Sequence, residues 1–116
     1  MSCAAGRAAL RALCEEDLVS RSESVGKWFH GLLEERLVPT GGVSDVRGLG
    51  MFIGIEFTAA DRTLAFVNGC RAEGILLGWT LHHDHIVRLA PPLVTPEDAL
   101  ENAARTMARV LARVMR

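Results

Sequence analysis

Lysine is almost absent from this chain of 116 residues, because Lys27 is the single lysine among thirteen basic residues and the other twelve are arginine. Any chemistry that requires a lysine amine must therefore use Lys27. Cysteine is also scarce. The three cysteines, Cys3, Cys14 and Cys70, are odd in number and form no CxxC pair, so the sequence predicts neither a disulfide framework nor a zinc cluster.

Long apolar runs and an excess of charge of one sign are missing too. The longest apolar run is far short of the ~20 residues that a membrane helix needs. Arg7 and Arg11 interrupt the apolar stretch near the N-terminus, and no signal-peptide layout follows. A net charge of −1 argues against nucleic acid as the main partner, since phosphate binding needs a basic field. We expect a cytoplasmic protein that binds neither a membrane nor nucleic acid.

The sequence does contain enough apolar residues for one small folded domain. It is 49% hydrophobic and 23% charged, a composition typical of globular chains and not of disordered ones. Its length suffices for one domain and is too short for two. We expect residues 1–38 to form a helical lead-in, residues 39–116 to form an α+β domain, and the whole chain, 1–116, to fold as one unit.

Helical patterns occupy the first third of the chain and its end. Residues 3–14 are rich in alanine, which favours a helix that packs closely against another surface. Residues 20–37 have the spacing of one buried helical face, with Ser20 or Ser22 as N-cap and Lys27 on the opposite, polar face. The expected buried residues of this helix are Val25, Trp28, Phe29, Leu32 and Leu33.

Two further helices and three strand-like segments follow. A helix is expected at about 61–73, ended by Gly74, and another begins at the N-cap Thr95. Residues 43–57 are rich in β-branched and aromatic residues and predict one or two strands with a bend at 48–50. Residues 75–79 and 85–89 predict two more strands. This order predicts an α+β fold with helices on one face of a small, mostly antiparallel sheet.

Arg88 is the most informative polar residue in the sequence. It lies inside the apolar segment 86–90, directly before Pro91 and Pro92. A guanidinium group binds a carboxylate through two parallel hydrogen bonds, which an ammonium group cannot do. The alternative is that Arg88 only points outward from a strand with one buried face, and the residue pattern alone favours this alternative.

Other polar groups have simpler interpretations. The run Arg47-Gly48-Leu49-Gly50 leads into a strand rather than a helix, so it predicts a backbone bend and not a phosphate loop. His82, His83 and His85 with Asp84 could ligate a transition metal, but a solvated turn is the preferred interpretation.

Two remaining residues are candidates for nucleophilic chemistry. Lys27 lies on the polar face of its helix, whereas a Schiff-base lysine works when it is desolvated in a pocket. Cys70 is expected to be a small core residue. From motif chemistry alone the sequence therefore predicts a small α+β domain without catalytic residues.

Three segments resemble class-III aminotransferases, which depend on pyridoxal phosphate. Residues 46–57, VRGLGMFIGIEF, are similar to the family's "VRGxGLMxGIEL" segment. Residues 86–95, IVRLAPPLVT, are similar to its "(I/V)RxxPPLxI(T/S)xEE" segment. Residues 8–13, AALRAL, are similar to an upstream helix of the family. The three occur in the family's order and spacing, and the resemblance covers nearly the whole chain.

The resemblance is greatest toward the ornithine, acetylornithine and 4-aminobutyrate aminotransferases, and it implies both a fold and a role for Arg88. The implied fold is the small C-terminal α+β domain of fold-type I pyridoxal-phosphate-dependent transferases. In this subgroup the arginine of the "RxxPPL" segment binds a substrate carboxylate, and that arginine corresponds to Arg88. The implied reaction transfers an amino group from ornithine or a related amino acid to a 2-oxo acid, and the family's dimers imply a homodimer.

The chain lacks the segments in which the family's cofactor-binding residues lie. It resembles only the final portion of the family's enzymes, whose Schiff-base lysine and phosphate-binding residues lie upstream. Lys27 corresponds to none of them. We therefore expect no catalytic, cofactor-binding or metal-binding residue in this chain, and we expect it to be a C-terminal fragment, a split-gene product or a shortened reading frame. An alternative is a non-catalytic assembly module, or an inactive remnant, that pairs with a separately encoded cofactor-binding portion.

Overall fold

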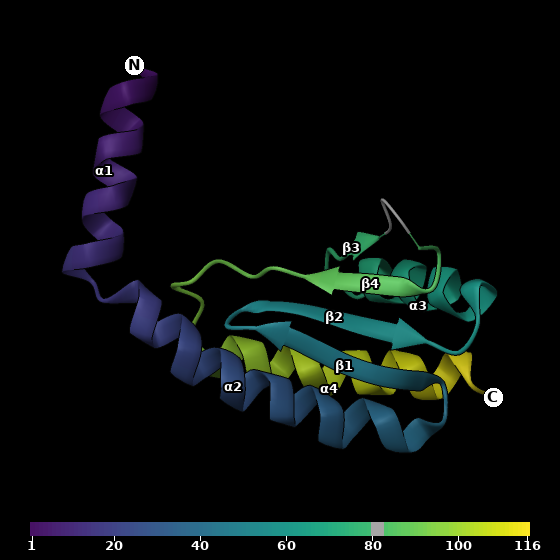
Figure 1. Cartoon of the computed structure of the whole chain (residues 1–116). Coiled ribbons are helices and arrows are strands. Elements are labelled where there is room, and N and C mark those ends of the chain that lie inside the picture. Colours follow the sequence, from purple (N-terminus) through teal and green to yellow (C-terminus); the bar gives the residue numbers. More distant parts are fainter. Residues whose placement is uncertain (80–82) are drawn as a thin grey trace.

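A computed structural model describes residues 1–79 and 83–116 of the chain (Figure 1). The helices are α1 (Ser2–Glu15), α2 (Leu18–Leu37), α3 (Ala60–Ala72) and α4 (Glu97–Val114), and a short 3-10 helix, η1 (Val38–Thr40), follows α2. The strands are β1 (Val43–Leu49), β2 (Phe52–Phe57), β3 (Gly78–Trp79) and β4 (Ile86–Leu89).

The strands form one antiparallel sheet in the order β1-β2-β4-β3. The pairing is set by a hairpin between β1 and β2, in which Leu49 faces Phe52. β4 then pairs with β2, so that Val87 faces Ile55, and the two-residue strand β3 pairs with the other edge of β4. The α+β architecture predicted from the sequence is confirmed.

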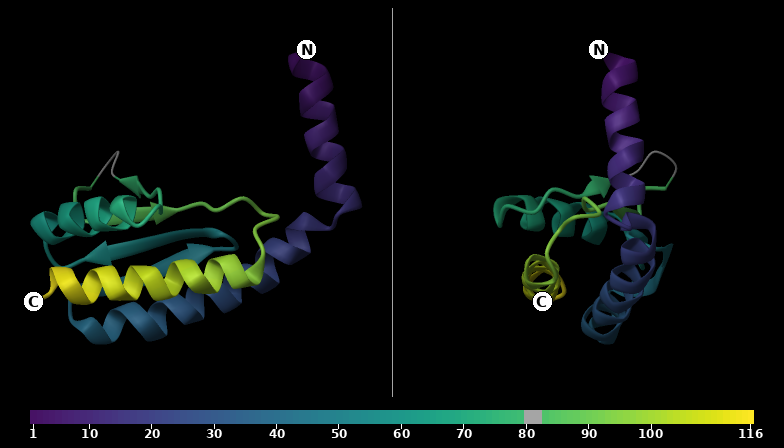
Figure 2. Two further views of the ribbon diagram at one scale, coloured as in Figure 1. Left: turned by 180° about the vertical axis from the view of Figure 1, so that it is seen from behind. Right: turned by 90° about the vertical axis from the view of Figure 1, so that its left-hand side faces the viewer.

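Three helices cover one face of the sheet. Viewed from behind, α2, α3 and α4 lie over the strands (Figure 2, left), and the other face of the sheet is turned toward the viewer in Figure 1. The core lies between the two layers. Its fully buried larger side chains are Phe29, Leu33, Leu37, Ile53, Ile55, Phe66, Val87, Met107, Val110 and Leu111.

A close contact between two glycines holds α2 against the β1–β2 hairpin. A Cβ atom at Gly26 would lie 2.2 Å from the carbonyl carbon of Gly50, so only glycine lets the helix approach this turn. Gly50 itself has φ 57°, in the left-handed region. Beside it, the amide of Met51 donates a hydrogen bond to Ser22 Oγ at 3.2 Å. The predicted bend is therefore a hairpin turn fixed by α2.

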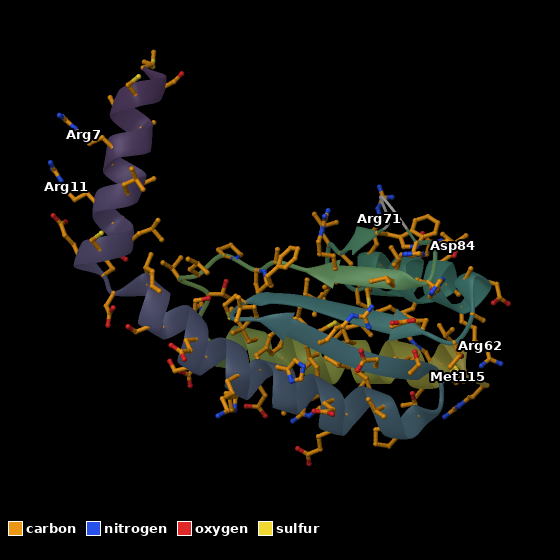
Figure 3. All side chains as sticks on the ribbon, in the orientation of Figure 1. Arg7, Arg11, Arg62, Arg71, Asp84 and Met115 are labelled. Atoms are coloured by element: carbon orange, nitrogen blue, oxygen red, sulfur yellow. The ribbon has the colours of Figure 1, made fainter. Side chains whose placement is uncertain are left out.

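Ionic contacts join the C-terminal end of α3 to α4. Arg113 and Arg109 both donate to the carboxylate of Glu73, at 2.6 and 3.0 Å. The hydrogen bond from Arg113, followed by the charge of Arg109, lowers the pKa of Glu73. At the other end of α3, Arg62 lies beside Met115, with its Nη1 atom 3.7 Å from the sulfur (Figure 3).

Helix α1 projects away from the rest of the molecule (Figures 1 and 2). Its residues are exposed, apart from the half-buried Ala12 and Leu13, and Leu10 keeps 66% of its surface exposed. Arg7 and Arg11 point outward from it (Figure 3). The predicted alanine-rich helix is therefore present, but among the described residues it contacts mainly the neighbouring α2, and its close packing against another surface stays a prediction.

Several predicted details of the elements are wrong. Asp17 has a left-handed backbone (φ 48°), which ends the helical conformation of α1, and α2 begins directly after it. Ser20 and Ser22 therefore lie inside α2 and do not cap it. Trp28 is 39% exposed rather than buried. The face of α2 that packs on the core carries Val25, Phe29, Leu33 and Leu37, with Leu32 partly buried beside it.

The other two corrections concern later segments. The strand predicted at 75–79 is restricted to Gly78 and Trp79. Thr95 does not cap α4; its hydroxyl donates to the carbonyl of Pro92 at 2.7 Å, and Pro96 occupies the N-cap position.

Candidate functional site

Strand alternation places Arg88 on the uncovered face of the sheet. Its neighbours in β4, Val87 and Leu89, are buried toward the helices, and successive side chains of a strand point to opposite faces. Arg88 is accordingly exposed. The outward direction inferred from the residue pattern is therefore the one that the structure shows.

Glycines flank Arg88 on both sides. Its cross-strand partner in β2 is Gly54, and its partner in β3 is Gly78. A Cβ atom at Gly78 would lie 3.2 Å from Arg88 Nε and 3.2 Å from the Arg88 carbonyl oxygen. The side chain of Arg88 therefore lies across β3, in the space that a side chain at position 78 would fill.

A second arginine on the same face has a different environment. Arg47 pairs with Gly54 from the β1 side. Its Nη1 atom donates to Asp45 Oδ2 at 2.6 Å and also to Glu56. The hydrogen bond to Asp45, and then that to Glu56, raises the pKa of Arg47. Within residues 1–79 and 83–116 no such acceptor or carboxylate engages Arg88, which leaves its guanidinium available to an external ligand.

Arg88 also lines a cavity beside β4. The cavity has a volume of about 570 Å³, and its walls come from residues 74–78, from residues 88–92 and from the buried faces of α2 and α4. The apolar side chains in its wall include Ile75, Leu77, Leu100 and Met107. Small-molecule sites have volumes of this order. The apolar wall lies on the helix-covered side of β4, and the Arg88 side chain leaves the strand on the other face.

Arg21 fixes the segment that follows Arg88. From α2, its Nε atom donates to the carbonyl oxygen of Leu93 at 2.9 Å, and its Nη2 atom donates to that of Thr95 at 2.6 Å. These bonds hold residues 93–95 against α2. Pro91 and Pro92 form part of the cavity wall. The bonds from Arg21 to the residues that directly follow them limit the movement of this wall.

Lys27 and Cys70 lie away from this site. Lys27 is exposed on α2, as predicted, beside a hollow of about 230 Å³ that Glu23, His30 and the hairpin turn line. Cys70 is fully buried in α3. Burial raises the pKa of its thiol to about 12, so the thiol stays protonated and is a core group rather than a nucleophile.

The histidine-rich turn contains ordinary surface contacts. His82 lies outside the described residues. His83 and Asp84 are exposed, and His85 Nδ1 lies 3.1 Å from Asp84 Oδ1. Among the described residues, no three His, Cys, Asp or Glu side chains are grouped so that they could hold a metal ion. Each helix among residues 1–79 and 83–116 is too short or too polar to cross a bilayer.

The sequence pattern indicated Arg88 but not the residues that surround it and hold the segment after it. The roles of Gly54 and Gly78 depend on strand register, which brings together positions 54, 78 and 88. Arg21 carries no motif, and its bonds join residues more than 70 positions apart.

The sequence is similar to ornithine aminotransferases. The ornithine aminotransferase of Bacillus subtilis (strain 168) is 36% identical over 111 residues, which are 96% of this chain and 26% of that enzyme. The ornithine aminotransferase of Bacillus cereus (strain Q1) is 38% identical over 112 residues, which are 97% of this chain and 27% of the enzyme. The chain thus spans about a quarter of the length of these relatives.

Solved structures share the fold. The acetylornithine aminotransferase of Elizabethkingia anophelis superposes with a TM-score of 0.86 at 30% identity, covering 96% of this chain and 28% of that one. A phospholyase from Arthrobacter, in complex with phosphoethanolamine, gives 0.87 at 30% identity, covering 94% and 28%. The family model of class-III aminotransferases matches residues 1–111. The chain therefore belongs to the class-III aminotransferase family.

Proposed function

We propose that this chain forms the C-terminal portion of an aminotransferase that transfers an amino group from ornithine or a related amino acid to a 2-oxo acid. Its part in the reaction is to bind a substrate carboxylate through Arg88. Ornithine aminotransferases are among its relatives at 36–38% identity, which supports this substrate class.

One observation carries the proposal: Arg88 is exposed, lies beside a cavity and has no ionic partner within the described residues, whereas Arg47 on the same face is bound by Asp45 and Glu56. A guanidinium without a partner can give both of its parallel N–H groups to a carboxylate. Holding the substrate by its carboxylate would fix its orientation, and such fixing lowers the barrier of the following step.

The described residues do not fit the family's cofactor. Class-III aminotransferases depend on pyridoxal phosphate, which acts as an electron sink once it is bound to a lysine. Lys27 is exposed and does not line the cavity beside Arg88. A lysine of this kind lacks the desolvation that would lower its pKa and activate the amine. The proposed contribution of this chain is therefore to bind the substrate.

The poor fit of the cofactor predicts a spectroscopic result. Adding pyridoxal phosphate to the purified chain is expected to give only the absorbance of the free cofactor, because exposed Lys27 offers no pocket. The Lys27→Ala variant is expected to give the same spectrum. A new visible band that disappears in Lys27→Ala would contradict the assignment.

A complementation assay tests the role of Arg88. The chain is mixed with the part of the Bacillus subtilis ornithine aminotransferase that precedes the matched region, and ornithine-dependent amino transfer is measured. Arg88→Lys is expected to raise KM by about 10- to 100-fold, since a charge-assisted hydrogen bond contributes ~1.5–3 kcal/mol and lysine cannot make the bidentate contact.

Arg71→Lys, an exchange of the same kind on the exposed surface of α3 (Figure 3), is the matched control and is expected to leave KM unchanged. Equal KM values for Arg88→Lys and the unmodified chain would remove Arg88 from the proposed site.

A second candidate function is a non-catalytic assembly module that docks on a separately encoded cofactor-binding partner. The exposed apolar side chains favour it. Leu49 and Phe52 are 87% and 58% exposed at the hairpin tip, and α1 exposes Leu10. Large apolar side chains exposed in this way are typical of interaction sites when they form a patch. Complex formation without amino transfer in the mixing experiment would support this candidate over the first.

A further inference from the structure

The position of Arg88 depends on the absence of a side chain at Gly78. In the β3–β4 pair these two residues face each other. A Cβ atom at Gly78 would lie 3.2 Å from Arg88 Nε and 3.2 Å from the Arg88 carbonyl oxygen, both tighter than ordinary contacts, and at the ordinary contact distance of 3.5 Å from Arg88 Cβ. An alanine at position 78 would require Arg88 Nε to move by a few tenths of an ångström, and the two further methyl groups of a valine would occupy more of the space in which the Arg88 side chain lies.

On the other side of Arg88 lies an acidic side chain that could capture it. Gly54 pairs with Arg88 and Glu56 pairs with Ile86, so Glu56 is the diagonal neighbour of Arg88. Diagonal neighbours are about 7–8 Å apart, within reach of long side chains. Gly54 places no side chain between them, and a Cβ atom there would meet nothing closer than 3.8 Å.

Glu56 already contacts two basic side chains on this face. It accepts a hydrogen bond from Arg47, and its Oε1 atom lies 3.7 Å from His85 Nε2. A carboxylate has about four lone-pair sites and accepts several donors, so Glu56 could also bind Arg88 if that side chain turned toward it. An Arg88 paired in this way would no longer be available to a ligand.

We propose that Gly78 is a positioning residue, which lets Arg88 lie across β3 and so keeps its guanidinium away from Glu56 and free for a carboxylate ligand. The role of the ligand rests on the proposed function, but the position of the side chain does not. The two parts can therefore be tested separately.

The test measures how fast phenylglyoxal modifies each arginine of the full chain, with mass spectrometry to locate the products. In the unmodified chain Arg88 is expected to react as fast as exposed Arg71, and Arg47 more slowly because two carboxylates bind it. Gly78→Val is expected to slow the reaction of Arg88 several-fold, because the arginine then pairs with Glu56. The double variant Gly78→Val, Glu56→Gln is expected to restore the original rate.

Two glycine variants complete the design. Gly31→Ala, on the open side of α2 with nothing within 4 Å of the added Cβ, is the matched control and is expected to leave the Arg88 rate unchanged. Gly78→Ala makes a smaller change and is expected to slow Arg88 to an intermediate extent. If Gly78→Val fails to fold, which would appear as fast modification of Arg47, the Gly78→Ala chain with and without Glu56→Gln decides the question.

The outcomes separate the two proposals. An Arg88 rate that is the same in the position-78 variants as in the unmodified chain would overturn the role of Gly78. A slowed rate that Glu56→Gln does not restore would overturn it as well, since the capture by Glu56 would be absent. Protection of Arg88 by added glutarate tests the proposed function alone. Without such protection Arg88 is not a carboxylate site, whatever the rates in the glycine variants.

Discussion

Replacing Gly26 with alanine is expected to lower the free energy of unfolding by about 1–3 kcal/mol, the range typical of overpacked interiors, with the effect at the upper end of that range. The added Cβ would lie 2.2 Å from both the carbonyl carbon and the carbonyl oxygen of Gly50. These are backbone atoms of the hairpin turn, which cannot rotate away as a side chain would. The helix must therefore move off the turn, and the Met51–Ser22 hydrogen bond lengthens with it.

Gly31→Ala on the same helix is the control for Gly26→Ala. Nothing lies within 4 Å of its added Cβ, and alanine favours a helix over glycine by about 1 kcal/mol. It is therefore expected to stabilise the chain, so the two substitutions should have effects of opposite sign. Urea denaturation of the full chain, followed by far-UV circular dichroism, measures both. A Gly26→Ala midpoint at or above that of the unmodified chain would show that the helix does not depend on this contact.

Replacing Phe29 with alanine is expected to cost about 3–5 kcal/mol, the usual effect of removing a buried aromatic side chain. Phe29 is 2% exposed and belongs to the main core cluster. It also lines the wall of the cavity beside Arg88, so its loss should open that cavity. Domains have only about 5–15 kcal/mol of stability in total, so this single change should bring the chain close to unfolding.

The neighbouring aromatic residue provides the control for Phe29→Ala. Trp28 precedes Phe29 in α2 but is 39% exposed, so Trp28→Ala removes a larger side chain with less buried surface. Its effect on the urea midpoint is expected to be clearly smaller than that of Phe29→Ala. Equal effects of the two substitutions would mean that α2 is rotated relative to the structure described above.

Much of the fold could be predicted because the apolar residues have clear periods. A helix was expected after Thr95, and the regularly spaced Leu100, Ala104, Met107 and Leu111 of α4 are buried. The glycines around position 50 predicted the bend that became the β1–β2 hairpin. These features are local, since each follows from residues within a few positions of one another.

The start of α2 could not be predicted in the same way. It depends on Asp17, whose positive φ is unusual for a residue other than glycine. Ser20 or Ser22 was expected to cap α2, but in the structure Ser20 donates its hydroxyl to Asp17 Oδ1 at 2.8 Å from within the helix. The same local signals are thus compatible with a helix that begins two or more residues earlier.

The candidate site combines predictable and unpredictable parts. The alternation of Val87, Arg88 and Leu89 predicted that Arg88 points away from the core. The glycines beside it became visible only through the register of three strands, and residues 54, 78 and 88 are too far apart in the sequence for any local pattern to connect them. The tether from Arg21 to residues 93–95 is of the same long-range kind.

The projecting first helix has a thermodynamic consequence. An isolated helix shorter than ~12–15 residues is only marginally stable in water, and α1 has 14 residues with none of them buried. We therefore expect its amide protons to exchange whenever the isolated helix unwinds. The amide protons of α2 around Phe29 and Leu33 are expected to exchange only when the core unfolds as a unit. The first fifteen residues are thus expected to melt separately from the core in the chain on its own, and a surface that covers α1 would raise the order of that segment.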